Sequence, residues 1–268
     1  MDGLDLNAII LAAGKGERLR PLTNDKPKCL VELFGKSLLE WQINSFQSFG
    51  ITDITVVTGY MSNKIDFPSV NIIKNENFDS TNMVETLFCA EEKFTDSTII
   101  SYGDIIFESS ILKKLISSQH DFSIIIDKNW LNYWKLRFEN PLDDAESLEL
   151  NSDGYLTSIG QKIFDITKIQ GQYIGLMKFQ NSGISNLQKF YHDAKNKAKS
   201  GKNPLNDKVD FKKSYMTDLL NSMILENFNL KAIEIQNGWL ELDSINDLKI
   251  YEKMDQKKTL KNIFNSTK

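Results

Sequence analysis

Positive charge and glycine gather in one short segment near the start of the chain, LAAGKGERLRPLTNDKPKCL, residues 11–30. Glycines leave backbone N–H groups free to bind anions, and lysine and arginine supply positive charge for phosphate. The whole chain carries a formal net charge of −4, so this positive charge belongs to a local site and not to the general surface. A nucleoside triphosphate, with several negative charges in one place, would fit such a segment. Its cations are Lys15, Arg18, Arg20, Lys26 and Lys28.

Two common phosphate-binding motifs do not account for this segment. The P-loop string G-x-x-x-x-G-K-[ST] is absent. In the dinucleotide motif G-x-G-x-x-G only Gly14 and Gly16 fit, because Leu19 takes the place of the third glycine. What remains is an apolar strand that ends in small residues and opens into a basic glycine turn. The alternative to a phosphate site is a basic turn in solvent.

The segment AAGKGERLRPLTNDKPK resembles the signature G-x-G-x-R-(L)-x-P-x-T…P-K of the nucleotidyltransferases that activate sugar phosphates and phosphocholine. SYGDIIFES and GWLELDSINDL are similar to the two motifs that carry metal-binding aspartates in these enzymes. DSTNMVETLFCA resembles the segment that lines the nucleoside. RFENPLDDAESL and GQYIGLMKF look most like a subset that includes phosphoglutamine cytidylyltransferase. Together the matches extend from residue 7 to about residue 250.

The resemblance implies a reaction and a role for individual residues. A substrate phosphate, already anionic near neutral pH, would attack the α-phosphorus of CTP and release pyrophosphate. Arg18 would bind the β- and γ-phosphates, and Lys28 would neutralise charge on the α-phosphate. Asp104 and Asp243 would bind Mg²⁺, for which Mn²⁺ could substitute. The nucleotide-binding residues by the same resemblance are Leu11, Ala12, Ala13, Gly14, Lys15, Gly16 and Asn82.

Several of these residues also have a purely structural explanation. Asp104 could be a turn residue at the end of a strand, and Asp243 could belong to the cap of the helix that follows Ser244. Asn82 could act only as a helix N-cap. Lys162 aligns with a family lysine that approaches the acceptor phosphate, but it could be a surface lysine.

The segment DKNWLNYWKLRFENPLDDAE, residues 127–146, bears on the acceptor. Four of its residues fall at positions i, i+3, i+4 and i+7, which share one face if the segment is helical. That face is either a packed stripe or one wall of an acceptor pocket. The four residues are Trp130, Tyr133, Trp134 and Arg137.

Two kinds of acceptor fit these residue types. The aromatic rings could hold the quaternary ammonium of phosphocholine. A phosphorylated amino acid could place its carboxylate on Arg137 and its amine on Asp143, Asp144 or Glu146. A choline site needs no guanidinium, so Arg137 favours the amino acid. Lys162, Tyr173 and Glu241 are further acceptor-binding candidates by family position, beside Trp130, Trp134 and Arg137.

These side chains must be positioned by alternating strands and helices. Such alternation predicts a mainly parallel sheet with helices on both faces. The resemblance implies a three-layer α/β/α architecture with a mixed sheet, the Rossmann-like nucleotide-diphospho-sugar transferase fold. We expect strands at 7–13, 54–58, 70–74, 98–103, 122–127, 173–179 and 230–236, and helices at 37–49, 82–93, 109–119, 184–198, 215–227 and 244–254.

The whole chain, 1–268, is expected to form a single domain, with an acceptor-binding insertion at roughly 128–180 and a mobile loop at 195–208. Two cysteines are too few to staple a chain of this length, so reduced thiols are expected. No apolar run is long enough to span a bilayer, and Asp2 and Asp5 stand where a signal peptide would be basic. We therefore expect a cytoplasmic protein that binds neither membrane nor nucleic acid; a homo-oligomer stays open.

The leading interpretation is a Mg²⁺-dependent cytidylyltransferase for a small phosphorylated amine or amino acid, serving surface-polysaccharide modification. One alternative is a uridylyl- or thymidylyltransferase that acts on a sugar 1-phosphate. The other is a nucleotide-binding regulatory module without catalysis. The presence of Arg18, Lys28, Asp104 and Asp243 together argues against that module.

Overall fold

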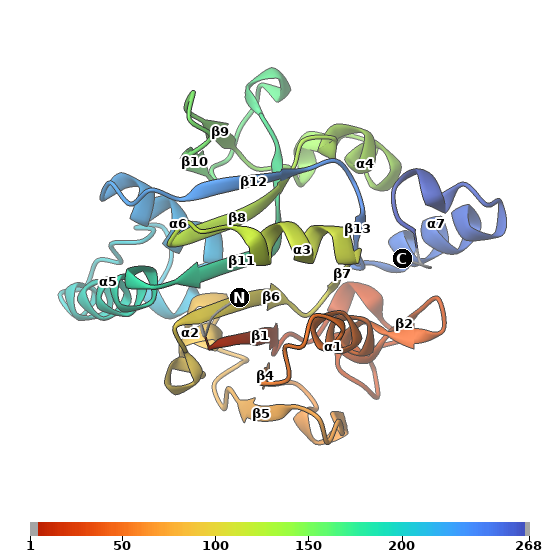
Figure 1. Ribbon diagram of the computed structural model, residues 1–268, viewed down its shortest axis with the longest axis horizontal. Coiled ribbons are helices and arrows are strands. Elements are labelled where there is room, and N and C mark those ends of the chain that lie inside the picture. Colours follow the sequence, from red (N-terminus) through yellow and green to blue (C-terminus); the bar gives the residue numbers. More distant parts are fainter. Residues whose placement is uncertain (1–4, 266–268) are drawn as a thin grey trace.

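The computed structural model of the protein describes residues 5–265, with a seven-stranded sheet at its centre (Figure 1). Asp2, one of the two acids behind the expectation of no export signal, lies outside the described residues. Strand β11 runs antiparallel to both its neighbours, and the other pairs of adjacent strands are parallel. In spatial order the strands are β12 (Lys231–Ile235), β8 (Phe122–Asp127), β11 (Gln172–Gln180), β6 (Ser97–Tyr102), β1 (Leu6–Ala12), β4 (Ile54–Thr58) and β5 (Asn71–Lys74).

Each strand of this sheet coincides with one expected from the sequence, and the ends differ by at most one residue. The reason is burial on both faces. In β8 all six residues are buried, and in β1 all but the first. Strands covered on both faces require continuous apolar runs, which stand out in a sequence. The predicted α/β fold with a mixed, mainly parallel sheet is confirmed.

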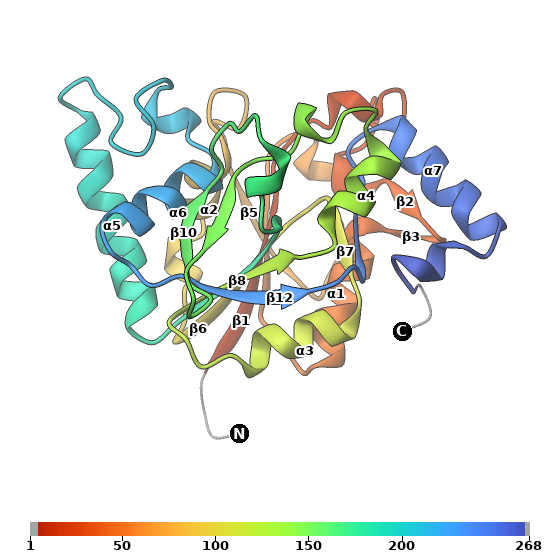
Figure 2. The ribbon, with the colours of Figure 1, turned by 90° about the horizontal axis from the view of Figure 1, so that it is seen from above.

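Helices cover both faces of the sheet and complete three layers (Figure 2). Ile10 points into a core shared with α1 and α3, whereas its neighbour Ile9 points into a core shared with α2, α5 and α6, because successive strand residues face opposite sides. Helices α4 and α7 pack against each other beside the first core. The helices are α1 (Leu38–Ser48), α2 (Met83–Phe88), α3 (Ser109–Ser117), α4 (Trp130–Arg137), α5 (Ser182–Ala198), α6 (Met216–Leu225) and α7 (Ile245–Gln256).

Two predicted segments differ from the structure. The helix expected at 82–93 ends at Phe88 and is followed by a separate 3₁₀ turn. The loop expected at 195–208 begins inside α5, and it is anchored further on. The Asn203 side chain is buried and donates hydrogen bonds to the Val209 carbonyl and to Ser214 Oγ, and Leu205 is buried beside it. The lysine-rich composition of this segment predicts a solvated loop, but composition does not reveal that Asn203 and Leu205 are buried.

Three short strand pairs lie outside the main sheet. The pair of β7 (Ile105–Phe107) with β13 (Trp239–Glu241) matters most, because Asp104 directly precedes β7 and Asp243 follows β13 after one residue. The others are β2 (Glu32–Leu33) with β3 (Lys36–Ser37), and β9 (Leu148–Leu150) with β10 (Leu156–Ile159).

The segment 128–180 contains α4, the β9–β10 hairpin and the central strand β11, so it is part of the sheet as well as of its flank (Figure 1). Cys29 is buried and Cys89 exposed, and both are free thiols. Between residues 5 and 265, no helix is long and apolar enough to cross a membrane.

Candidate active site

The glycine turn after β1 lies closely against the segment that carries Lys28. Gly16 has a φ of +63°, in the left-handed region that favours glycine. A Cβ there would stand 2.8 Å from Lys28 Cβ, so a side chain would push Lys28 away. Thr23 Oγ1 donates a 2.9 Å hydrogen bond to the Gly16 carbonyl and fixes the turn. Gly14 faces open space, where a ligand can approach the backbone.

Two aspartates that are far apart in the sequence meet beside this turn. Asp104 precedes β7 and Asp243 follows β13, and the antiparallel pairing of Ile105 with Glu241 brings the two strand ends together. The amide of Leu242 donates to the Asp104 carbonyl at 2.9 Å. Carboxylate oxygens of Asp104, Glu241 and Asp243 all lie within 4.8 Å of one another.

Lys28 and Arg18 are paired with these acids. Lys28 Nζ lies 2.7 Å from Asp104 Oδ2 and 2.5 Å from Asp243 Oδ1, and Arg18 Nη2 lies 2.6 Å from Asp243 Oδ2. Burial alone would lower the pKa of Lys28, but the charges of Asp104 and Asp243 raise it above its usual range. Burial would raise the pKa of Asp243, but Lys28, together with Arg18 and Arg137, outweighs that effect and lowers it.

The acidic cluster fits a divalent cation. Asp104 Oδ1 is buried, and among residues 5–265 it has no hydrogen-bond partner. A buried carboxylate oxygen without a partner is costly unless a cation or a donor binds it. Carboxylate oxygens are the ligands that Mg²⁺ prefers. Asp104 and Asp243 therefore have the chemistry of the metal site expected from the sequence, with Glu241 as a third acid.

A cavity of about 580 Å³ extends from this cluster along the glycine turn. Two expected nucleotide-binding residues do not line it. Ala13 is buried, and its carbonyl accepts a hydrogen bond from the Tyr60 amide. The Asn82 side chain accepts from the Met83 amide at 2.8 Å and caps α2. The lining includes the expected residues Leu11, Ala12, Gly14, Lys15, Gly16, Arg18, Lys28, Asp104 and Asp243, and also Phe78, Asp79, Met83 and Tyr102.

A second cavity, of about 200 Å³, adjoins the first, because Met83 and Tyr102 line both. Trp134, Tyr173 and Glu241, three of the expected acceptor-binding residues, line this smaller cavity. Its other lining residues include Asp144, Glu146, Gln172, Tyr215 and Trp239.

Arg137 is placed differently from the expectation of a free carboxylate-binding group. Its side chain is fully buried, with Nη1 2.6 Å from Glu241 Oε2 and Nε 3.0 Å from Asp247 Oδ1. Two carboxylates therefore already neutralise the guanidinium. The sequence could not reveal this pairing, because Asp247 lies 110 residues away from Arg137 in the chain.

The aromatic stripe of α4 is mostly core. Trp130 and Tyr133 are buried, and each packs edge-on against Trp134, which alone of the three reaches the smaller cavity. Lys162 lies on an exposed loop, with Nζ 5.3 Å from the Phe164 ring centre, and lines neither cavity. Asp143 is also exposed.

The smaller cavity is strongly acidic. Asp144 Oδ2 accepts a 3.0 Å hydrogen bond from Trp134 Nε1, and burial raises the pKa of Asp144. Glu146 keeps an exposed surface where it lines this cavity. Partial desolvation, followed by the charges of Asp144 and Asp218, raises its pKa to about 7. No lysine or arginine of the described chain lines this cavity. A ligand with a positive charge would relieve the repulsion between these acids.

Several lining residues were not predicted from the sequence, among them Phe78, Asp79, Met83 and Tyr102 of the larger cavity. Asp79 and Met83 lie inside the segment that resembles a nucleoside lining, and Tyr102 lies two residues before Asp104. These three could have been found from the motifs that contain them. Phe78 precedes the motif, and nothing in the pattern marks it.

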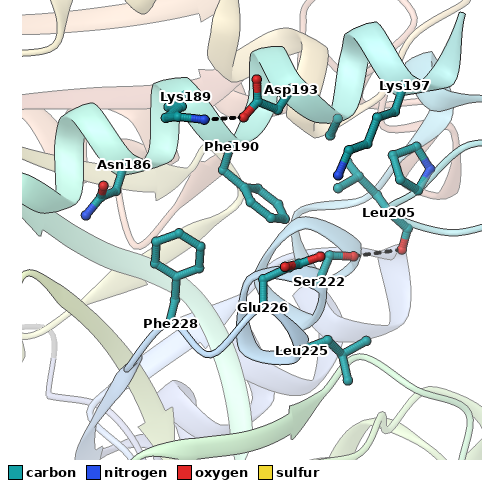
Figure 3. A pocket seen from close by; sticks show the side chains of 12 residues that line it. Asn186, Lys189, Phe190, Asp193, Lys197, Leu205, Ser222, Leu225, Glu226 and Phe228 are labelled. Atoms are coloured by element: carbon teal, nitrogen blue, oxygen red, sulfur yellow. Dashed lines mark hydrogen bonds and ion pairs between the residues drawn. The ribbon is translucent and has the colours of Figure 1, made fainter.

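A third cavity, of about 410 Å³, lies between α5 and α6 and shares no lining residue with the other two (Figure 3). Phe190 and Phe228 point into it, and Leu205 closes one side. The charges of Lys189 and Asp193 at its rim neutralise each other across 2.5 Å. It offers no group of convergent acids or bases, so we place the chemistry at the first two cavities.

The chain is similar to several known nucleotidyltransferases. Residues 8–134 match the MobA-like NTP transferase domain. The chain is 40% identical to CTP:phosphoglutamine cytidylyltransferase of Campylobacter jejuni over 91% of its own length and 98% of the relative. It is 26% identical to 2-aminoethylphosphonate cytidylyltransferase of Lancefieldella rimae over 92% of each chain. The structure of CTP:phosphocholine cytidylyltransferase from Streptococcus pneumoniae shares the fold, with a TM-score of 0.68, 21% identity, and coverage of 94% of this chain and 98% of that one.

The chain therefore belongs to the MobA-like NTP transferases, a family of nucleotidyltransferases. Within that class its activity is that of a cytidylyltransferase, as the sequence predicts.

Proposed function

We propose that the protein transfers the CMP group of CTP to a small phosphorylated molecule that carries an ammonium group, similar to phosphoglutamine, and releases pyrophosphate. The observation that supports this proposal is the pair of joined cavities. One combines the glycine turn with Arg18 and Lys28, and the other is lined by carboxylates. Met83 and Tyr102, which line both, mark the boundary between nucleotide and acceptor.

The triphosphate of CTP would lie along the glycine turn. Gly14 faces the open cavity, so backbone N–H groups there can approach phosphate oxygens. The guanidinium of Arg18 can make two parallel hydrogen bonds to the β- and γ-phosphates. Lys28 is only 14% exposed, so its charge acts on the α-phosphate with little screening by water.

Asp104 and Asp243 would hold Mg²⁺, with Glu241 beside them. The unpartnered Oδ1 of Asp104 is the observation that favours this assignment. The ion, when bound, supplies positive charge that neutralises phosphate oxygens during transfer. Mn²⁺ accepts similar oxygen ligands and is expected to substitute.

The acceptor's positive end would lie between Asp144 and Glu146. These carboxylates line the smaller cavity, whereas Arg137 is occupied by Glu241 and Asp247. The relatives' names agree in one respect: glutamine, 2-aminoethylphosphonate and choline all carry an amino or ammonium nitrogen. The ring of Trp134 can cover the ammonium group from one side.

Catalysis would consist of alignment and charge neutralisation. The acceptor phosphate attacks the α-phosphorus, the bond from that phosphorus to the β-phosphate oxygen breaks, and pyrophosphate leaves. The acceptor phosphate is already an anion, so no side chain has to remove a proton. His192 pairs with Glu91 and His120 packs against Tyr155, and neither lines the two cavities.

Further expectations belong to the same proposal. Segment 128–180 of a single domain would shape the acceptor cavity, and Lys162 would reach the acceptor phosphate if its loop moved toward the cavity. The reaction would take place in the cytoplasm, where CTP is made. A role for the product in surface polysaccharide depends on the resemblance alone.

A pyrophosphate-release assay tests the proposal. CTP, UTP, dTTP, ATP and GTP would be combined with Mg²⁺ and with phosphorylated amines, phosphorylated amino acids or hexose 1-phosphates. We expect release from CTP with acceptors that carry an ammonium group. Release from UTP or dTTP with hexose 1-phosphates, and none from CTP, would overturn the proposal. Tight CTP binding without turnover of any acceptor would also overturn it.

A further inference from the structure

The charged groups of the nucleotide cavity are already paired with one another. Lys28 bridges Asp104 and Asp243, and Arg18 holds the second oxygen of Asp243. In the proposed function, however, the two cations bind phosphate and the two acids bind a metal ion. Each of these four side chains therefore contacts another side chain of the protein in place of the ligand that the reaction requires.

We infer that Lys28 and Arg18 serve as internal counter-ions in place of the metal, and that the metal and the triphosphate therefore bind cooperatively. This inference rests on the proposed function, since it concerns the same cavity. It adds an energetic coupling between binding of the metal and binding of the triphosphate, and it assigns that coupling to Lys28 and Arg18. Neither the fold nor the comparisons assign such a role to Lys28 or Arg18.

Lys28 and Arg18 balance the charges of Asp104 and Asp243 without any ligand. Glu241 instead contacts Arg137, which it shares with Asp247. The side chains of Lys28, Asp104 and Asp243 are 14%, 17% and 12% exposed, so water screens them poorly. A metal ion alone would add positive charge next to Lys28 and Arg18. A triphosphate alone would add negative charge next to the acids.

Binding of both ligands removes this conflict. A triphosphate that attracts Lys28 and Arg18 leaves the oxygens of Asp104 and Asp243 free for a cation. A cation on those oxygens in turn releases the two side chains for phosphate. The internal contacts have to be broken for either ligand, but only once when both bind, so each ligand increases the affinity of the other.

The geometry also identifies which residue dominates. Lys28 is mostly buried and contacts both acids, whereas Arg18 is 64% exposed and contacts Asp243 alone. A charge pair in solvent contributes little compared with a buried one. Lys28 should therefore limit metal binding far more than Arg18 does.

The first experiment measures Mn²⁺ binding without nucleotide, by calorimetry or electron paramagnetic resonance. Lys28→Met should bind Mn²⁺ about tenfold more tightly than the unmodified protein, a typical size for a coupling between sites. Lys28→Arg keeps the positive charge, so its affinity for Mn²⁺ should remain as weak as that of the unmodified protein. Lys15→Met is the matched control, because Lys15 lines the same cavity but pairs with Asp79, and its Mn²⁺ affinity should change less than twofold. Arg18→Met should show a smaller gain than Lys28→Met, and as an exposed position it preserves the fold.

The second experiment measures binding of CTP in EDTA. Asp243→Asn should strengthen metal-free CTP binding severalfold, because it releases Lys28 and Arg18. Asp193→Asn removes a negative charge at the rim of the third cavity, away from both cations, and it should leave this affinity unchanged. Thermal unfolding of each variant establishes that it is folded.

The outcomes separate two kinds of failure. If Lys28→Met binds Mn²⁺ no more tightly than Lys15→Met, and Asp243→Asn does not strengthen CTP binding, the counter-ion inference is wrong although the proposed function survives. If no variant binds Mn²⁺ or CTP under any condition, the proposed function fails as well.

Discussion

At the scale of single residues, the structure distinguishes charged side chains that other side chains already neutralise from charged side chains that line a cavity. Arg137 has the residue type of a carboxylate receptor, but Glu241 and Asp247 occupy it completely. Asp144 and Glu146 line a cavity to which no lysine or arginine of residues 5–265 contributes. The sequence placed Arg137, Asp144 and Glu146 near the acceptor by residue type, and Glu241 by family position. Only the structure distinguishes the paired Arg137 from the two carboxylates that line the cavity.

Glu146 predicts how acceptor binding depends on pH. Its pKa is raised to about 7, and only the ionised carboxylate attracts an ammonium group. Protonation increases as pH falls through this value, so we expect the KM for the acceptor to rise about tenfold between pH 8 and pH 6, since one unit below the pKa leaves about a tenth of the group ionised. Initial rates at saturating CTP measure this change.

Glu146→Gln is the control for that measurement. The variant should have a high KM at pH 8 already, and any remaining pH dependence belongs to the acceptor's own phosphate. If the profiles of the two proteins are parallel over this range, Glu146 does not hold the acceptor's cation.

At the scale of elements, the site depends on three-residue strands and a helix cap. The β7–β13 pair brings Asp104 to Asp243, and the N-terminus of α7 fixes the backbone after β13. Asp247 Oδ2 accepts hydrogen bonds from the amides of Asp243 and Ser244, while Oδ1 binds Arg137. One side chain thus connects Asp243, the proposed metal ligand, to Arg137, whose other partner Glu241 lines the smaller cavity.

Asp247→Ala is expected to reduce both stability and turnover, although Asp247 lines neither cavity. The substitution breaks a buried ion pair, so the free energy of unfolding should fall by about 3 kcal/mol. Urea denaturation measures it. Ser244→Ala removes the other half of the capping box and should cost only about 1 kcal/mol. Equal losses in the two variants would show that the Arg137 contact contributes nothing.

The elements themselves differ in how well the sequence predicts them. Strands such as β8 are buried on both faces and give an unbroken apolar signal, so all seven central strands were found. The strands β7 and β13 have three residues each and show no periodicity. The proximity of Asp104 and Asp243 could therefore be expected only from resemblance to a family, not from the pattern of residues.

At the scale of the whole molecule, both cavities lie where the parallel strands β1 and β6 end, the usual place for ligands in open α/β sheets. In the proposed function, a chain with a net charge of −4 would thereby bind an anion and a cation next to each other. The local positive charge would bind the triphosphate, and the acids of the smaller cavity would bind the acceptor. Composition alone could exclude a general nucleic-acid surface, but it could not predict that positive charge lies in one cavity and negative charge in the other.

The most direct test of the account is a ³¹P NMR spectrum of one reaction mixture. It would contain the protein, CTP, Mg²⁺, phosphorylated glutamine and glucose 1-phosphate at equal concentrations. We predict resonances of pyrophosphate and of a cytidine diphosphate ester of the amino compound, with the glucose 1-phosphate signal unchanged. Consumption of glucose 1-phosphate, or a spectrum in which CTP persists beside both acceptors, would contradict the claim that the two joined cavities bring CTP and an ammonium-bearing phosphate together.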